Sequence, residues 1–248
     1  MTHARTTLVL VPGLVCDRAV WASQRDALAR DATLVVADHG LRDSLGDMAE
    51  AILGQVAGPF ALAGHSMGGR VALEVLARAP ERVTHLALLD TGFEALAAGE
   101  DGERERAGRQ RLVEIARREG MRAMGAEWVR GMVHPARLAD RPLLDGILDM
   151  IGRSSVPQFE AQVRALLARP DRTALLPQIR CPTLVLCGHE DAWSPISRHH
   201  DIARRIPDSV LVDVPDCGHM STLEQADIVS AALLAWLHEV RPPYVVEV

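Results

Sequence analysis

A serine lies between two glycines where an apolar run gives way to a helical pattern. The segment Phe60–Pro80 is FALAGHSMGGRVALEVLARAP, and Ser66 is flanked by Gly64 and Gly68. Small residues let a strand and a helix approach closely at a sharp turn. Such a turn holds the hydroxyl above the strand end, where free N–H groups at the helix start favour negative charge. The pattern therefore predicts a nucleophilic serine.

The general base that a serine hydroxyl needs is best sought among ten histidines. His219, in VPDCGHMSTLEQ, follows an apolar run by a short Pro/Gly loop, so we expect it at the same sheet edge as the serine. His199 and His200 fall in a helical pattern, and we expect them to be solvated. His238 ends the last helical pattern, where capping is the expected role. His219 is therefore the predicted base.

An acid must orient this base, and Asp191 in TLVLCGHEDAWSP is the first candidate because it follows an apolar run by four residues. Asp90 also ends an apolar run, LALLD, and stays open as a rival. Glu190 is expected to face away, at the surface. With Asp191 the order along the chain is Ser66, Asp191, His219, the order of α/β-hydrolase sites.

Two N–H donors must face the oxyanion of a tetrahedral intermediate. The residue after the serine, Met67, offers its backbone N–H from the helix start. The second donor is expected in the loop VPGLVCD, where Pro12 has no N–H and Gly13 allows a tight turn. We therefore assign the backbone N–H of Leu14 as the second donor.

Six short apolar runs predict buried parallel strands, because helical patterns lie between most of them. The runs are Thr7–Val11, Thr33–Ala37, Phe60–Ala63, Val83–Leu89, Thr183–Cys187 and Ser209–Val214. The helical patterns beside the first strands are Asp17–Arg30, Ser44–Ala57 and Gly68–Arg78. Strand and helix alternation of this kind predicts an α/β fold with a six-stranded, mostly parallel sheet flanked by helices. The run Tyr244–Val248 could add an edge strand.

The alternation stops between Leu89 and Thr183, where no convincing strand occurs. Four helical patterns fill this stretch: Glu103–Glu119, Met121–Met132, Leu143–Ile151 and Val156–Ala168. We expect residues 93–177 to form a helical lid inserted between the fourth and fifth strands, over a core of residues 1–92 and 178–248. A separate helical domain is the alternative.

Four motifs in this order resemble the α/β-hydrolase fold superfamily. They are PGL at 12–14, GHSMGG at 64–69, GHEDAWSP at 188–195 and DCGHMSTLEQ at 216–225. Within the superfamily the chain is similar to small capped esterases and to the 3-oxoadipate enol-lactonase and meta-cleavage C–C hydrolase branch. It departs from the usual His-Gly before the oxyanion donor, which here is Pro12-Gly13.

The resemblance implies a serine hydrolase that cleaves small carboxylic esters or lactones through an acyl-serine intermediate. Hydrolysis of a C–C bond in a meta-cleavage product, acyl transfer and perhydrolysis use the same three residues and stay open. A non-catalytic ligand receptor is a further alternative. No metal, flavin or nicotinamide motif occurs in the sequence, so we expect no cofactor.

The lid is expected to line the substrate pocket. The candidate wall residues are Trp128, Met132, Met150 and Trp193. Meta-cleavage hydrolases usually carry an arginine near the nucleophile that binds a carboxylate. Arg70 is close to Ser66 in sequence, but we expect it on the helix and outside the pocket. Arg130 and Arg153 on the lid are other anion-binding candidates, with solvation the expected role.

The amino-acid composition limits which binding partners and which cell compartment we expect for this protein. The formal net charge is −6 and no basic patch is visible in the sequence, which argues against nucleic acid or an acidic membrane as a partner. The four cysteines fit no zinc motif or CxxC pair, and we expect a reduced, cytoplasmic protein with a small-molecule substrate. No signal peptide is evident, and the sequence leaves the oligomeric state open.

Overall fold

A seven-stranded sheet runs through the computed structural model, which describes residues 5–246. Its order is β2-β1-β3-β4-β5-β6-β7, and every neighbouring pair is parallel except β6 with β7. The strands are β1 (Thr6–Val11), β2 (Ala32–Val36), β3 (Phe60–His65), β4 (Val83–Leu89), β5 (Thr183–Gly188), β6 (Val210–Val214) and β7 (Val245–Val246). The predicted α/β class and mostly parallel sheet are therefore confirmed.

The predicted strand count of six is wrong by one. The edge strand β7 has two residues and pairs antiparallel with Leu211 and Val212 of β6. A strand of two residues is too short to show an alternation of apolar and polar residues in the sequence. It is recognised only by its pairing with β6. It lies within the run Tyr244–Val248, of which residues 247 and 248 lie outside the described residues.

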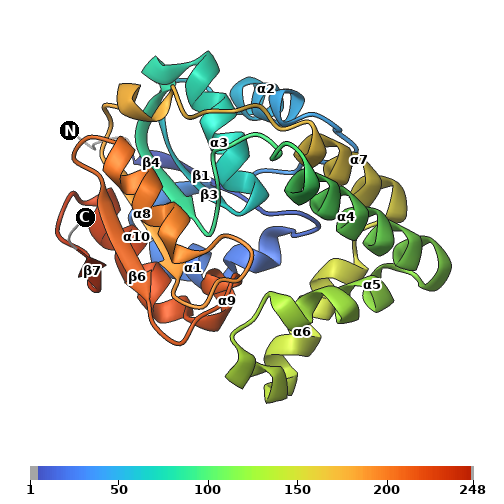
Figure 1. Ribbon diagram of the computed structural model, residues 1–248. Helices are drawn as coiled ribbons and strands as arrows, with labels where there is room; N and C mark the ends of the chain where they lie inside the picture. Colours follow the sequence, from blue (N-terminus) through green and yellow to red (C-terminus); the bar gives the residue numbers. More distant parts are fainter. Residues whose placement is uncertain (1–4, 247–248) are drawn as a thin grey trace.

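Helices flank the sheet (Figure 1). They are α1 (Ala22–Leu28), α2 (Leu45–Gln55), α3 (Met67–Arg78), α4 (Glu100–Glu119), α5 (Met121–Trp128), α6 (Arg141–Gly152), α7 (Val156–Leu167), α8 (Ile196–Arg205), α9 (Ser221–Glu224) and α10 (Ala226–Leu237). α1 packs against α10, and α2 packs against α3. The helix predicted over Asp17–Arg30 is divided: a 3-10 turn, Arg18–Trp21, is capped by the Asp17 side chain and precedes α1.

Between β4 and β5 the chain forms α4, α5, α6 and α7, which Figure 1 shows gathered at one side of the sheet. α4 contacts α5 and α7, and α5 contacts α6. Of these, α4 has 20 residues but is charged along its length. Within residues 5–246 no helix combines the length and apolar composition needed to cross a bilayer.

Leu, Val and Ala side chains make up most of the core, with large buried side chains such as Trp21 and Phe60 among them. All residues of β3 and β5 are buried, as parallel strands covered by helices on both faces must be. This explains why these strands are continuous apolar runs without alternation.

The register aligns the carboxyl ends of the central strands. Val11 pairs with Gly64, His65 pairs with Leu89, and Gly188 pairs with Val214. The loops that follow these strands therefore gather at one sheet edge, where ligands bind in open α/β sheets.

The turn from β3 into α3 depends on two glycines. A Cβ atom at Gly64 would overlap the carbonyl of Gly68, and a Cβ atom at Gly68 would overlap the carbonyl of Val11. Because the obstructing atoms belong to backbone, no side-chain movement relieves the overlap. The glycines thus let α3 begin directly against β1 and β3.

We predict that Gly68→Ala lowers the free energy of unfolding by about 1–3 kcal/mol, the usual cost of overpacking. Gly54→Ala is the control, because Gly54 is exposed in α2 and a Cβ there meets no atom within 4 Å. That control should gain about 0.5–1 kcal/mol from helix propensity. Urea denaturation of the two variants measures both effects. Equal stability changes in the two variants would contradict the packing argument.

Candidate active site

Ser66 has a backbone conformation that non-glycine residues rarely adopt. Its φ is 56° and its ψ is −119°. Its N–H donates to the carbonyl of Leu89 at 2.8 Å, and its carbonyl accepts the Thr91 hydroxyl at 2.6 Å. These bonds to the end of β4 stabilise the strained turn, which holds the serine at the carboxyl edge of the sheet.

A chain of hydrogen bonds runs from Ser66 through His219 to Asp191. His219 Nε2 lies 2.8 Å from Ser66 Oγ, and His219 Nδ1 lies 2.7 Å from Asp191 Oδ2. His219 and Asp191 are 4% and 2% exposed. The structure thus brings together the three residues predicted for catalysis, with the histidine able to accept the serine proton.

Asp191 is arranged to stay ionised. Its second oxygen accepts the N–H groups of Trp193 and Ser194, both at 2.8 Å. Burial opposes ionisation, but the charge of His219 and these hydrogen bonds outweigh it and lower the pKa of Asp191 below its ordinary value.

The contact between Asp191 and His219 also raises the pKa of His219. Burial alone would lower it, but the negative charge of Asp191 and its hydrogen bond to Nδ1 raise the pKa above the ordinary value of 6.5. A histidine base can take up a proton in one step and return it in the next.

Asp90, the rival acid, has other partners. It accepts the N–H of Gly188 at 2.9 Å and shares a hydrogen bond with the Ser221 hydroxyl. Burial and the nearby charge of Asp191 raise the pKa of Asp90 well above its ordinary value. The pKa values of the two carboxyl groups are therefore shifted in opposite directions, and Asp191 is the one that hydrogen-bonds with His219.

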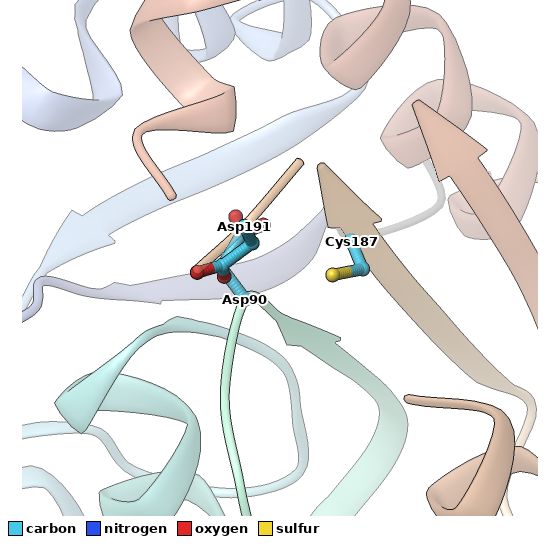
Figure 2. A group of neighbouring side chains, drawn as sticks. All are labelled: Asp90, Cys187 and Asp191. Carbon is cyan, nitrogen blue, oxygen red and sulfur yellow. The ribbon is translucent and has the colours of Figure 1, made fainter. Parts of the chain in front are cut away.

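Asp90, Asp191 and Cys187 form a cluster of potential metal ligands, with their side chains close together at the ends of β4 and β5 (Figure 2). The carboxylates already accept the hydrogen bonds described above. Cys187 donates to the carbonyls of Gly188 and Ser194, and burial raises its pKa, which disfavours the thiolate that binds metals. This donor set does not fit a metal ion.

Leu14, in the loop after β1, lines the cavity at Ser66. Within residues 5–246, neither the Leu14 nor the Met67 N–H donates to a protein acceptor. Both residues line the same cavity as Ser66 and His219. Two unsatisfied amides beside a serine hydroxyl form an arrangement suited to an oxyanion.

Two residues that the sequence analysis missed hold this loop. His39 hydrogen-bonds with the carbonyl of Pro12 at 3.0 Å, and the Gln162 side chain of α7 accepts the Val15 N–H at 2.8 Å. Val15 has a φ of 51°, so the loop is strained as well as anchored. His39 and Gln162 are distant in sequence from the loop, and no local pattern connects them with it.

The segment that follows α5 holds the loop of His219. The His219 N–H donates to the Met132 carbonyl at 2.7 Å, and the His134 N–H donates to Glu224 at 2.7 Å. Glu224 also accepts the Met220 N–H at 3.1 Å. Residues between β4 and β5 thus position the histidine through backbone contacts.

A cavity of about 270 Å³ lies at Ser66 and His219. Of the predicted wall residues, Trp128 and Trp193 line it, and their rings meet edge to face at 5.8 Å. Met132 and Met150 do not line it, and both are buried in the hydrophobic core. Their helical spacing reflects packing, with Met132 contributing its carbonyl to His219.

Arginines are the main feature of this cavity that the sequence analysis missed. Arg70 lines the cavity, so the expectation that it lies outside the pocket is wrong. Arg153 instead pairs with Asp17 at 2.7 Å, and Arg130 is exposed on a different surface. One turn of α3 separates Arg70 from Ser66, and this spacing was the available signal.

His199 is buried, which contradicts the expectation that it is solvated. Its Nε2 accepts the Thr91 N–H at 2.9 Å, and Nδ1 lies 3.2 Å from the Pro195 carbonyl. Burial lowers the pKa of His199 to about 4, so the ring stays neutral and can accept this bond. Because Thr91 holds the Ser66 carbonyl, His199 supports the serine turn from α8.

Known proteins resemble this chain over nearly its whole length. The sequence model of the family described as "Alpha/beta hydrolase family" matches residues 8–232. A dihydrolipoyllysine-residue acetyltransferase component of the acetoin cleaving system from Pseudomonas putida is 30% identical over 94% of this chain, which spans 64% of that protein.

Two solved structures superpose closely. A thermophilic esterase from Thermogutta terrifontis, with malate bound, has a TM-score of 0.83 and 30% identity, covering 95% of this chain and 91% of the esterase. The enol-lactonase from Burkholderia xenovorans LB400 has a TM-score of 0.82 and 21% identity, covering 96% of this chain and 94% of the enol-lactonase. The second match shows a shared fold.

We predict that Asp191→Asn lowers the pKa of His219 by about 1–3 units, because it removes the adjacent negative charge. Asp90→Asn should shift it less, since the charge of Asp191 and its hydrogen bond raise the pKa of His219 more than Asp90 does. Histidine NMR titration of the wild-type protein and both variants measures these values, and the wild-type pKa should exceed 6.5. Equal shifts in the two variants would contradict Asp191 as the main charged partner of His219.

Proposed function

Because this chain is an enzyme of the alpha/beta hydrolase family, we propose that it hydrolyses small carboxylic esters or lactones through an acyl-serine intermediate. One observation carries the proposal: Ser66, His219 and Asp191 form a continuous chain of hydrogen bonds. In this proposal Ser66 is the nucleophile, His219 the general base and Asp191 the acid that orients it.

Acylation begins when Ser66 Oγ attacks the ester carbonyl and His219 Nε2 accepts the hydroxyl proton. The tetrahedral intermediate collapses, the acyl C–O bond breaks, and His219 returns the proton to the leaving alcohol. Water then attacks the acyl-serine by the same route, with His219 as base, and releases the carboxylic acid. Asp191 stays ionised and stabilises the imidazolium in both steps.

The amides of Leu14 and Met67 are assigned to the oxyanion. Both residues line the cavity at Ser66, and their N–H groups have no acceptor within residues 5–246, which leaves them available to a developing negative charge. The N-terminus of α3 adds its dipole at the same place.

We assign residues 93–177 as a cap over a core formed by residues 1–92 and 178–248. This assignment is supported by the cavity wall, to which the segment between β4 and β5 contributes Trp128, Glu105, Arg109 and Arg169. A cavity of about 270 Å³ is smaller than the usual range of roughly 300–1,000 Å³ for ligand pockets, which favours a small substrate. The four free cysteines fit a reducing compartment, and we assign a cytoplasmic location.

Acyl transfer is the second candidate, favoured by the 30% identity to a protein named as an acetyltransferase component. It would use the same acyl-serine, with an alcohol or thiol in place of water. Adding an alcohol to the ester assay separates the two, because a transferase yields a new ester in preference to the acid.

We predict that Ser66→Ala lowers hydrolysis of p-nitrophenyl acetate and p-nitrophenyl butyrate by roughly 10³-fold or more. The matched control is Ser23→Ala, an exposed serine of α1 outside the cavity, which should keep wild-type activity. Release of p-nitrophenol is followed spectrophotometrically. Equal low rates for wild type and Ser66→Ala would contradict an acyl-serine mechanism for simple esters.

The pH dependence follows from His219. The base must be neutral to accept the serine proton, and its pKa lies above 6.5. We therefore predict that kcat/KM for p-nitrophenyl acetate falls as pH decreases, with an apparent pKa above 6.5. Rates corrected for spontaneous hydrolysis between pH 5 and about 9 test this. A profile that stays flat down to pH 5 would rule out His219 as the base.

A further inference from the structure

A second cavity, of about 870 Å³, lies beside the loop that follows β1. That loop contributes Leu14 to the cavity at Ser66 and Cys16 to the second cavity, and no residue lines both. Most of the remaining wall comes from α1 and the turn before it, from the loop after β2 and from α7. The volume falls within the range of roughly 300–1,000 Å³ that is usual for ligand pockets. The chemistry proposed at Ser66 gives this second cavity no role.

His39 lines the second cavity with one ring nitrogen unused. The residue is 4% exposed, and its Nε2 lies 3.0 Å from the Pro12 carbonyl. Because a carbonyl oxygen only accepts, Nε2 carries the proton of the neutral ring and Nδ1 has a free lone pair. Burial lowers the pKa of His39 below its ordinary value, which keeps the ring uncharged at neutral pH. Within residues 5–246 no group donates a hydrogen bond to Nδ1.

Gln162 of α7 leaves a donor in the same cavity. It is 1% exposed, and its Oε1 accepts the Val15 N–H at 2.8 Å. This bond fixes which end of the side-chain amide is the oxygen, so the remaining group is the Nε2 donor. In the part of the chain that the structure describes, Nε2 has no acceptor. Nδ1 of His39 and Nε2 of Gln162 both keep some solvent-accessible surface, so a molecule in the cavity can reach them.

The charged side chains around the second cavity leave these two groups unused. Asp17 pairs with Arg153 through both carboxylate oxygens, at 2.7 and 3.1 Å. Arg18 and Arg25 form no ion pair with any residue between 5 and 246. A carboxylate would suit these arginines, but it has no hydrogen to donate to the lone pair of His39. A ligand that satisfies both His39 and Gln162 must carry a donor as well as an acceptor.

We propose that the second cavity binds a small molecule with an uncharged amide group, whose N–H donates to Nδ1 of His39 and whose carbonyl accepts from Nε2 of Gln162. An amide supplies a donor and an acceptor on neighbouring atoms without a net charge. Polar groups of nearly buried side chains are costly unless they are hydrogen-bonded, and this ligand satisfies both. The inference does not rest on the proposed ester hydrolysis.

The position of this site suits an effector better than a substrate. His39 and Gln162 hold the loop of Leu14 through Pro12 and Val15, so a ligand in the second cavity contacts the two supports of that loop. Ser66 and His219 do not line this cavity, so a ligand there meets neither the proposed nucleophile nor its base.

Benzamide is the probe, and NMR spectroscopy of isotope-labelled wild-type protein measures its binding. We expect a Kd of about 1 mM or lower, the affinity usual for so small a ligand. The signals of the Gln162 side-chain amide and of His39 Nδ1 should shift. Acetophenone keeps the ring and the carbonyl without the N–H, and benzoate replaces the amide with a carboxylate. Each should bind about tenfold more weakly, because one hydrogen bond is lost.

Ala22→Trp tests where the probe binds. Ala22 is exposed in α1 and lines the second cavity, so an indole there fills space without replacing either polar group, and benzamide binding should be lost. The matched control is Ala29→Trp, because Ala29 is exposed directly after α1 and does not line the cavity. This control should keep the wild-type Kd.

Gln162→Glu tests the donor itself. The variant keeps an oxygen for the Val15 N–H and replaces the Nε2 donor with a second oxygen, so the Kd for benzamide should rise by tenfold or more. If this buried substitution prevents folding, the comparison of Ala22→Trp with Ala29→Trp decides the location alone.

Four results would overturn the proposal. No shift of the His39 and Gln162 signals at about ten times the expected Kd would show that the cavity does not bind an amide. Equal binding of acetophenone, or tighter binding of benzoate, would contradict the amide class. Shifts confined to Met67 and His219, or competitive inhibition of p-nitrophenyl acetate hydrolysis, would place benzamide in the cavity at Ser66. Unchanged binding in Ala22→Trp would contradict the second cavity as the site.

Discussion

The site depends on the close approach of three backbone segments at the carboxyl edge of the sheet. α3 begins so close to β1 that the carbonyl of Val11 leaves no space for a Cβ atom at Gly68. This contact forces the chain to turn sharply at Ser66, with φ at 56°. The strain is supported by bonds to Leu89 and by Thr91, which His199 holds in place. The serine, the amide of Met67 and the first turn of α3 are thus positioned by a single packing constraint.

Two buried carboxyl groups at this edge of the sheet have pKa values that are shifted in opposite directions. Asp191 accepts two amide N–H groups and hydrogen-bonds with His219, and its pKa is lowered, whereas burial and the charge of Asp191 raise the pKa of Asp90. The pKa of His219 rises because its partner is charged. The pKa values of two carboxyl groups that follow adjacent strands therefore differ because their surroundings differ. Arg70, Arg109, Arg169 and Arg198 line the same cavity as Ser66 and His219.

The sequence was sufficient to predict features that depend on local order. The α/β class followed from apolar runs alternating with helical patterns, and Ser66, Asp191 and His219 were selected because each follows a predicted strand. The arginine cluster was missed because its members come from four segments, and no periodicity connects them. Met132 and Met150 were assigned to the pocket by their apolar character, which cannot distinguish a cavity wall from packed core. β7 was missed from the strand count because two residues carry no pattern.

Covalent labelling of the serine tests the central claim most directly. Wild-type protein is treated with phenylmethanesulfonyl fluoride, a reagent that transfers a sulfonyl group to activated serines, and the modified peptide is identified by mass spectrometry. The account predicts one adduct, located on Ser66, that is absent in Ser66→Ala and strongly slowed in His219→Gln. No adduct, an adduct on another residue, or labelling of Ser66 at the same rate in His219→Gln would contradict an activated nucleophile at this turn.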